Sequence, residues 1–166
     1  MTRLLAFLAC LLLAPAAVAE VIQGVVFHVI DGDTLLLRTQ AAAPRAFVKV
    51  RLADIDAPEL DQPFGTAAKA ALARRVENRT VTVVLVATDD YGRRVGWVRA
   101  GGVDVNRALV NEGLAWAYTR YHRNPALRAV EQDARRARRG LWRDEGAIAP
   151  WRWRHREALS RPFASR

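Results

Sequence analysis

Five short segments rich in β-branched residues, separated by turn signals and helical stretches, most constrain how this chain can fold. In residues 47–52, apolar side chains occupy every second position while Lys49 and Arg51 fall on the opposite face. Such alternation is typical of a strand with one buried face. The predicted strands cover residues 21–30, 34–38, 47–52, 80–87 and 93–99.

Three helical stretches are predicted between and after these strands, at residues 63–76, 105–112 and 125–139. The last begins at a proline and ends before Gly140, and its apolar stripe of Leu127, Val130, Ala134 and Ala137 predicts core packing. Five strands with inserted helices favour an α+β fold, a five-stranded Greek-key barrel of the OB type with about three helices. The pattern supplies strand number and order, and the barrel is inferred from them.

The two ends of the chain differ in composition from its centre. Arg3, a short apolar run and the small residues at 17–19 are typical of a cleaved signal peptide, predicted over residues 1–19. Its apolar run is too short to span a bilayer. We therefore expect an exported protein, periplasmic or extracellular, that has no membrane attachment after cleavage. A single folded domain is predicted over residues 20–143.

A basic tail is predicted over residues 144–166. The tail is rich in arginine, and its sequence predicts no regular secondary structure. Two placements of the tail remain open. It can lie on the barrel through Trp151 and Trp153, or it can be mobile.

Charge and cysteine content limit the classes of function. The chain has a formal net charge of +9, and only Lys49 and Lys69 among its 26 basic residues are lysines. Arginine forks match phosphate oxygens, so the bias suits a polyanionic partner, although codon usage and solubility would explain it too. The only cysteine, Cys10, lies in the predicted signal peptide, which excludes a disulfide or thiol chemistry in the mature protein.

Six of the seventeen acidic residues fall between positions 31 and 61, against four basic residues in the same stretch. Asp33 ends the turn between the first two predicted strands, and Asp56 and Glu59 follow the third strand. Gathered carboxylates repel one another unless a cation or a raised pKa compensates. An ordinary polar turn would explain the acidic residues at 31–33 taken alone, and another would explain those at 54–61 taken alone. Together with Arg51 and Arg93, the carboxylates indicate a phosphoryl-transfer site.

Several strings occur in an order and spacing that, taken jointly, are specific. They are DGDT (31–34), VRLADIDAPE (50–59), QPFG (62–65), DYGR (90–93), VNRALVNEGLAW (105–116) and GLW (140–142). The chain thereby resembles the staphylococcal nuclease-like, or thermonuclease, family over about residues 21–142. The resemblance implies a calcium-dependent endonuclease that acts on DNA, RNA or both and leaves 3′-phosphate and 5′-hydroxyl ends. We expect a monomer.

The resemblance also implies roles for individual residues. Asp33 and Asp56 correspond to the family's calcium ligands, together with the main-chain carbonyl of Ala57. Glu59 corresponds to the glutamate that acts as general base or positions the attacking water. Arg51 and Arg93 correspond to the arginines that hold the phosphate and stabilise the transition state.

Two departures from the family pattern concern substrate binding. Asp90 stands where members carry a lysine before the tyrosine of the YGR turn, and the loop after the glutamate is shortened to residues 60–65. Two rival functions remain. The barrel could bind nucleic acid or a peptide without catalysis, or the chain could be an envelope protein whose tail binds anionic polymers. The presence of every site residue favours the enzyme.

Overall fold

The computed structural model describes residues 20–39, 47–118 and 124–160, so the predicted signal peptide lies outside the described residues. Its strands are β1 (Val21–Val29), β2 (Thr34–Thr39), β3 (Phe47–Leu52), β4 (Ile55–Asp56), β5 (Thr80–Thr88), β6 (Arg94–Ala100), β7 (Val103–Asp104) and β8 (Trp116–Ala117). Its helices are α1 (Gly65–Val76), α2 (Val105–Asn111), α3 (Pro125–Arg136), the 3-10 helix η1 (Gly140–Arg143) and α4 (Pro150–Ser160).

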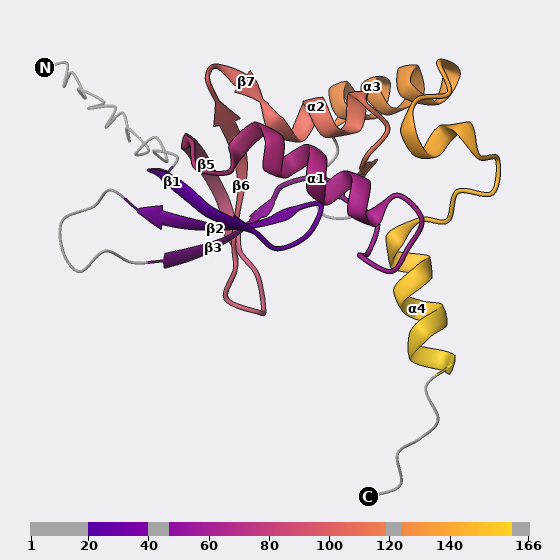
Figure 1. Ribbon diagram of the computed structural model, residues 1–166, viewed down its shortest axis with the longest axis horizontal. Coiled ribbons are helices and arrows are strands. Elements are labelled where there is room, and N and C mark those ends of the chain that lie inside the picture. The colour runs from indigo at the N-terminus through magenta and orange to yellow at the C-terminus, as the bar shows by residue number, and fades with distance from the viewer. Residues whose placement is uncertain (1–19, 40–46, 119–123, 161–166) are drawn as a thin grey trace, which may run out of the picture.

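The five long strands form a closed barrel, as Figure 1 shows. Their order is β3-β2-β1-β5-β6, and a parallel pairing of β3 with β6 closes the sheet. Neighbours along the rest of the sheet run antiparallel. This arrangement confirms the predicted α+β barrel, and each long strand agrees with its prediction to within one residue at either end.

Alternating burial explains why these segments form strands. In β3, Val50 and Leu52 are buried in the barrel while Phe47 and Lys49 are exposed. β2 and β5 bury their own alternate apolar residues in the same core. Each fully buried Val or Leu contributes roughly 1.5–3 kcal/mol, so the strand pattern also fixes the register.

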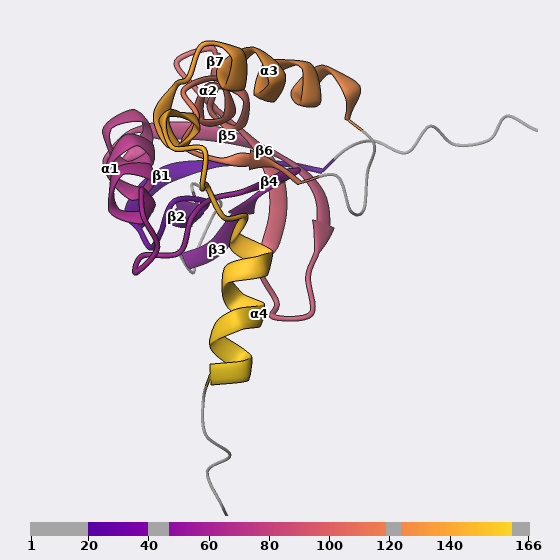
Figure 2. The same ribbon diagram turned by 90° about the vertical axis from the view of Figure 1, so that its right-hand side faces the viewer.

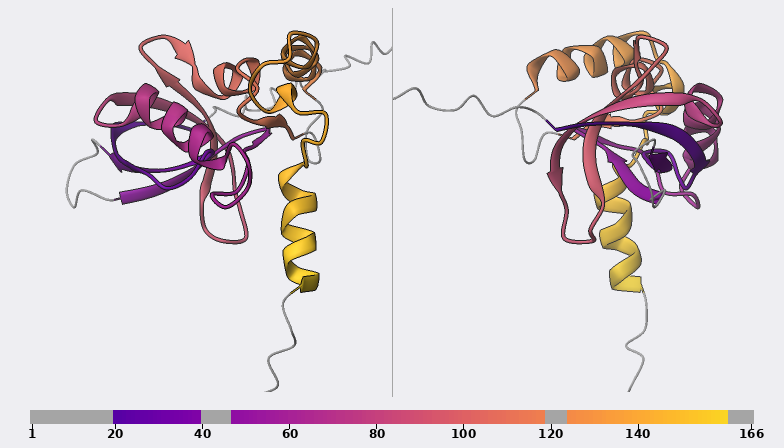
Figure 3. Two further views of the ribbon diagram at one scale, coloured as in Figure 1. Left: turned by 45° about the vertical axis from the view of Figure 1, so that its right-hand side comes forward. Right: turned by 90° about the vertical axis from the view of Figure 1, so that its left-hand side faces the viewer.

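The three predicted helices cover the barrel, and side-chain hydrogen bonds determine where two of them begin. Asp104 caps α2 by accepting a hydrogen bond from the Arg107 amide, and Asn124 caps α3 before a proline in the first turn. In Figures 2 and 3, α2 and α3 lie together on one side of the barrel, while α1 packs against β1 and α2. Helix α3 ends at Arg136, so the prediction that Ala137 belongs to its buried stripe is wrong.

Residues 150–160 form a fourth helix, α4, which corrects the prediction of an irregular tail. Trp151 and Trp153 both contact the rest of the protein, consistent with the first of the two placements left open for the tail. The helix projects away from the barrel in Figures 1 and 2. None of the helices in the described residues is long and apolar enough to cross a membrane.

Asn106, fully buried on α2, ties the helix to the barrel wall. Its side-chain amide donates to the carbonyls of Ala53 at 2.9 Å and Gly96 at 3.3 Å, and its Oδ1 accepts from the Val98 amide at 3.0 Å. Buried backbone groups require such partners. The side chain thereby fixes the end of β3 against β6.

We expect Asn106→Ala to lower the free energy of unfolding by about 1–3 kcal/mol, because the buried Val98 amide loses its acceptor. Urea denaturation of the variant and the parent measures this directly. The exposed neighbour Arg107 offers a control, and its alanine variant should unfold at nearly the parent's urea concentration. Equal stability of all three proteins would contradict the assigned role.

Candidate active site

Two acidic turns meet at one end of the barrel. The register pairs Thr34 of β2 with Arg51 of β3, which brings the turn before β2 beside the turn after β3. Asp33 is 4% exposed and Asp56 only 1% exposed, so both carboxylates are removed from water. Burial at this depth is costly for a charge unless partners compensate it.

Arg51 provides that compensation. Its Nη1 donates to Asp33 Oδ1 and its Nη2 to Asp56 Oδ1, both at 2.8 Å. Burial alone lowers the pKa of Arg51, but the two carboxylates outweigh it and raise that pKa above its ordinary value. One planar guanidinium thus holds two acids from different turns, a geometry that a lysine ammonium does not reproduce.

Burial has the largest effect on the Asp33 carboxyl. It raises the pKa of Asp33 to about 7, and Asp31 and Asp56 add to the rise, while Arg51 and the Ala57 amide oppose it. The Ala57 amide donates to Asp33 Oδ2 at 3.0 Å. A cation beside the carboxylate would offset the cost of burying its negative charge.

Gly32 permits the close approach of the two turns. A Cβ atom at this position would lie 2.6 Å from the Ala57 Cβ and 2.8 Å from the Ala68 Cβ. Both distances are shorter than contacts between real Cβ atoms, so any side chain would push the Asp33 turn away from Ala57. The glycine therefore brings the first turn within hydrogen-bonding range of the second.

Glu59 lies at the edge of this cluster in a tight loop. Its amide donates to the Gln62 side-chain oxygen at 3.2 Å, and its carbonyl accepts from the Gln62 amide at 2.9 Å. Gln62, itself 6% exposed, also donates to the Ile148 carbonyl at 2.6 Å. The base predicted from the sequence is thereby fixed to the segment that leads into α4.

Arg154 of α4 is the site residue that sequence reasoning missed. Its Nη2 donates to Asp56 Oδ2 at 2.8 Å, and its Nη1 donates to Glu59 Oε1 at 2.5 Å and to Asp56 Oδ1 at 3.3 Å. Partial burial lowers the pKa of Arg154, but the hydrogen bonds and charges of Asp56 and Glu59 raise it above the ordinary value. The run of alternating Trp and Arg residues at 151–154 was the available signal.

Arg93 lies apart from these ion pairs. It follows the β5–β6 turn, where its Nε donates to Asp89 Oδ2 at 2.7 Å and its guanidinium lies over the Tyr91 ring at 5.4 Å. These contacts hold Arg93 at the base of the turn. Within the described residues it forms no ion pair with Asp33, Asp56 or Glu59.

A second hydrophobic cluster lies next to the strand that carries Asp56. Asp56 pairs with Trp116 across the two-residue strands β4 and β8. Trp116 packs edge-on against Trp142 with ring centroids 4.4 Å apart, and the Arg135 guanidinium lies over both rings. Asp56 therefore rests on a packed scaffold, which restricts its position.

The donor set fits a hard cation held in an open site. Carboxylate and carbonyl oxygens are the ligands that calcium and magnesium prefer. In residues 20–39, 47–118 and 124–160, no three His, Cys, Asp or Glu side chains gather closely enough to hold a metal ion by themselves. Asp33 and Asp56 could supply two ligands, with water and substrate oxygens completing the shell.

Comparison with known proteins places this geometry in a family. Residues 49–144, more than half of the chain, match the family model described as "Staphylococcal nuclease homologue". The chain belongs to the staphylococcal nuclease family. This result agrees with the resemblance carried by the sequence motifs and with the barrel.

Three bacterial relatives match over most of their length. An uncharacterized endonuclease of Escherichia coli O157:H7 is 40% identical over 137 residues, which cover 82% of this chain and 87% of that protein. Protein ParB of Escherichia coli is 43% identical, covering 97% of this chain and 94% of its own. Micrococcal nuclease of Shigella flexneri is 41% identical, covering 80% of each.

We expect Arg51→Lys to lower the free energy of unfolding by about 1.5–3 kcal/mol, because a single ammonium cannot hold Asp33 and Asp56 together. Urea unfolding in EDTA measures the loss without interference from divalent cations. Arg93→Lys is the matched control and should cost less than about 1 kcal/mol, since its ion pair joins neighbouring residues of one turn. Equal losses in the two variants would disprove the bridging role.

Proposed function

We propose that this protein is a nuclease that hydrolyses phosphodiester bonds in DNA, RNA or both with the help of calcium. The observation that carries the proposal is the convergence of Asp33, Asp56 and Glu59 around guanidinium groups at one end of the barrel. Carboxylates for a hard cation beside arginine forks suit charge development on a phosphate. The names of the Shigella relative and of the Escherichia coli endonuclease point the same way.

Each residue of the site has a role in this scheme. Asp33, Asp56 and the Ala57 carbonyl would hold calcium, which when bound supplies positive charge beside the phosphate. Arg51 holds the two carboxylates together, and it would stabilise negative charge on the phosphate oxygens. Glu59 orients a water molecule in line with the leaving oxygen and accepts its proton.

Arg93 would contact the phosphate from the β5–β6 turn. It lies at the base of the β5–β6 turn, which extends from the barrel on the same side as α4 in Figures 1, 2 and 3. The bond from its Nε to Asp89 orients the guanidinium, whose outer nitrogens would bind the phosphate. We infer that the products carry 3′-phosphate and 5′-hydroxyl ends, as in the family.

Glu59→Gln and Asp33→Asn should fail in different ways. We expect Glu59→Gln to reduce cleavage of supercoiled plasmid by about 100-fold or more, the usual scale of general-base catalysis, while calcium binding persists. Asp33→Asn should weaken calcium binding and reduce cleavage with it. Gel assays in calcium or EDTA, paired with isothermal titration calorimetry of calcium, separate the two effects.

Asp61→Asn provides a matched control, because Asp61 is an exposed carboxylate of the same loop. It should leave both cleavage and calcium binding near the parent values. The role assignment is wrong if Glu59→Gln abolishes calcium binding while Asp33→Asn preserves it. Plasmid cleavage that is equal in calcium and in EDTA would remove the calcium requirement.

We further propose that the chain is an exported monomer, periplasmic or extracellular, with no membrane attachment once its signal peptide is removed. The small residues at positions 17 and 19 support cleavage after Ala19. Mass spectrometry of protein recovered outside the cytoplasm should therefore show Glu20 as the first residue. Exported protein that retains Met1 would contradict the proposal.

A further inference from the structure

Helix α4 inserts a cation into the candidate active site. The guanidinium of Arg154 bonds to Asp56 and Glu59 at once, with its shortest contact at 2.5 Å. These are a predicted calcium ligand and the predicted base. Arg154 thus brings one positive charge to the carboxylates of Asp56 and Glu59, where a divalent cation would bring two.

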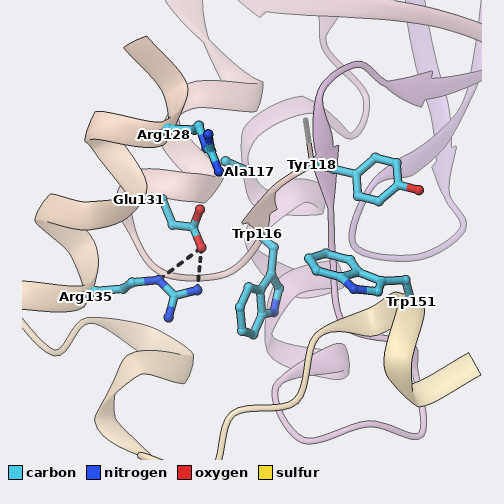
Figure 4. Close-up of a pocket in the computed structure, with 7 residues that line it drawn as sticks. All are labelled: Trp116, Ala117, Tyr118, Arg128, Glu131, Arg135 and Trp151. Atoms are coloured by element: carbon cyan, nitrogen blue, oxygen red, sulfur yellow. Dashed lines mark hydrogen bonds and ion pairs between the residues drawn. The ribbon is translucent and has the colours of Figure 1, made fainter. Parts of the chain in front are cut away.

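Two tryptophans in the first turn of α4 also attach the helix to the rest of the protein. The Trp151 ring packs against Trp116, with centroids 5.7 Å apart, and against Tyr118 at 5.4 Å. It forms one wall of an open cavity of about 390 Å³ (Figure 4). Trp153 lines a smaller cavity beside Phe64. Beyond Arg154, residues 155–159 are exposed.

A helix held in this way can be displaced. Isolated helices shorter than about 12–15 residues are marginal in water, so the eleven residues of α4 depend on their docking contacts. The side chain of Arg154 is 44% exposed, so solvent reaches the ion pair from one side. Calcium at Asp56 would compete directly with the guanidinium for the same oxygens.

Docking of α4 also affects Glu59. The Arg154 Nη1 donates a hydrogen bond to Glu59 Oε1 at 2.5 Å. The position on the carboxylate that a water molecule needs is then shared with Arg154.

We propose that α4 is a displaceable cover of the active site, in which Arg154 competes with the metal cation for the carboxylate oxygens of Asp56 and Glu59. The inference rests on the proposed calcium site at Asp33 and Asp56. In the resting protein Arg154 occupies Asp56 and Glu59. Binding of calcium releases the helix and frees both carboxylates together.

Calcium titration by calorimetry on the full chain, without nucleic acid, tests the competition. Arg154→Gln should bind calcium roughly 10-fold to 100-fold more tightly than the parent, the range that corresponds to a lost charge-assisted hydrogen bond. Arg156→Gln is the matched control, since it removes the same charge from an exposed position of the same helix. Its calcium affinity should equal that of the parent. A chain ending at Ala149 should behave like Arg154→Gln.

Limited trypsin digestion supplies a second readout that does not depend on activity. Calcium should accelerate cleavage after Arg152 in the parent, because the released helix unfolds. In Asp33→Asn, which keeps both partners of Arg154 but loses a calcium ligand, calcium should leave the cleavage rate unchanged. Cleavage in Arg154→Gln should be fast with or without calcium.

The outcomes separate this inference from the proposed function. The cover is overturned if Arg154→Gln and the shortened chain bind calcium no more tightly than the parent does. This holds even if Asp33→Asn loses calcium binding as proposed. A loss of plasmid cleavage in Arg154→Gln at saturating calcium would make Arg154 a phosphate-binding residue and likewise overturn the cover. Absence of calcium binding in every protein overturns both proposals.

Discussion

The contact between Arg51 and two buried aspartates is the interaction on which the rest of the site depends. Asp33 and Asp56 come from different turns, and both are almost fully removed from water. Without a shared cation their repulsion would separate the turns, and the Glu59 loop follows directly from the second turn. Arg51 is internal to the barrel sheet, so the fold itself supplies the first counter-charge.

The site lies where two hydrophobic clusters meet. One cluster fills the barrel, and the other gathers Trp116, Trp142 and neighbouring apolar residues beneath α3 and η1. Asp56 belongs to the short strand that joins them, with Ile55 in the barrel core and Trp116 directly opposite. Packing on both sides limits the motion of Asp56, whereas Glu59 and Arg154 are placed by loops and an exposed helix. Exposure therefore increases from the proposed metal ligand Asp56 towards the base Glu59.

The sequence predicted the barrel well because alternation in the five long strands is strong. It also assigned Asp33 and Asp56 to one candidate site, and the pairing of β2 with β3 brings their turns together. It did not predict α4, because the Trp and Arg residues at 151–154 lack a simple apolar stripe and the tail looked irregular. The docking of Arg154 depends on tertiary contacts more than ninety residues away in sequence, which no local pattern encodes. The two-residue strand β4 is likewise too short to show a period.

The register of β2 and β3 separates the two ends of these strands by function. Thr34 pairs with Arg51 at the acidic end, and Arg38 pairs with Phe47 at the other. Arg38 and Phe47 therefore lie at the end of the strand pair that is remote from the carboxylates. The side chain of Phe47 is exposed there. A fluorescent label attached at position 47 would be separated from Asp33 and Asp56 by the length of both strands, so it would report on the protein without entering the acidic cluster.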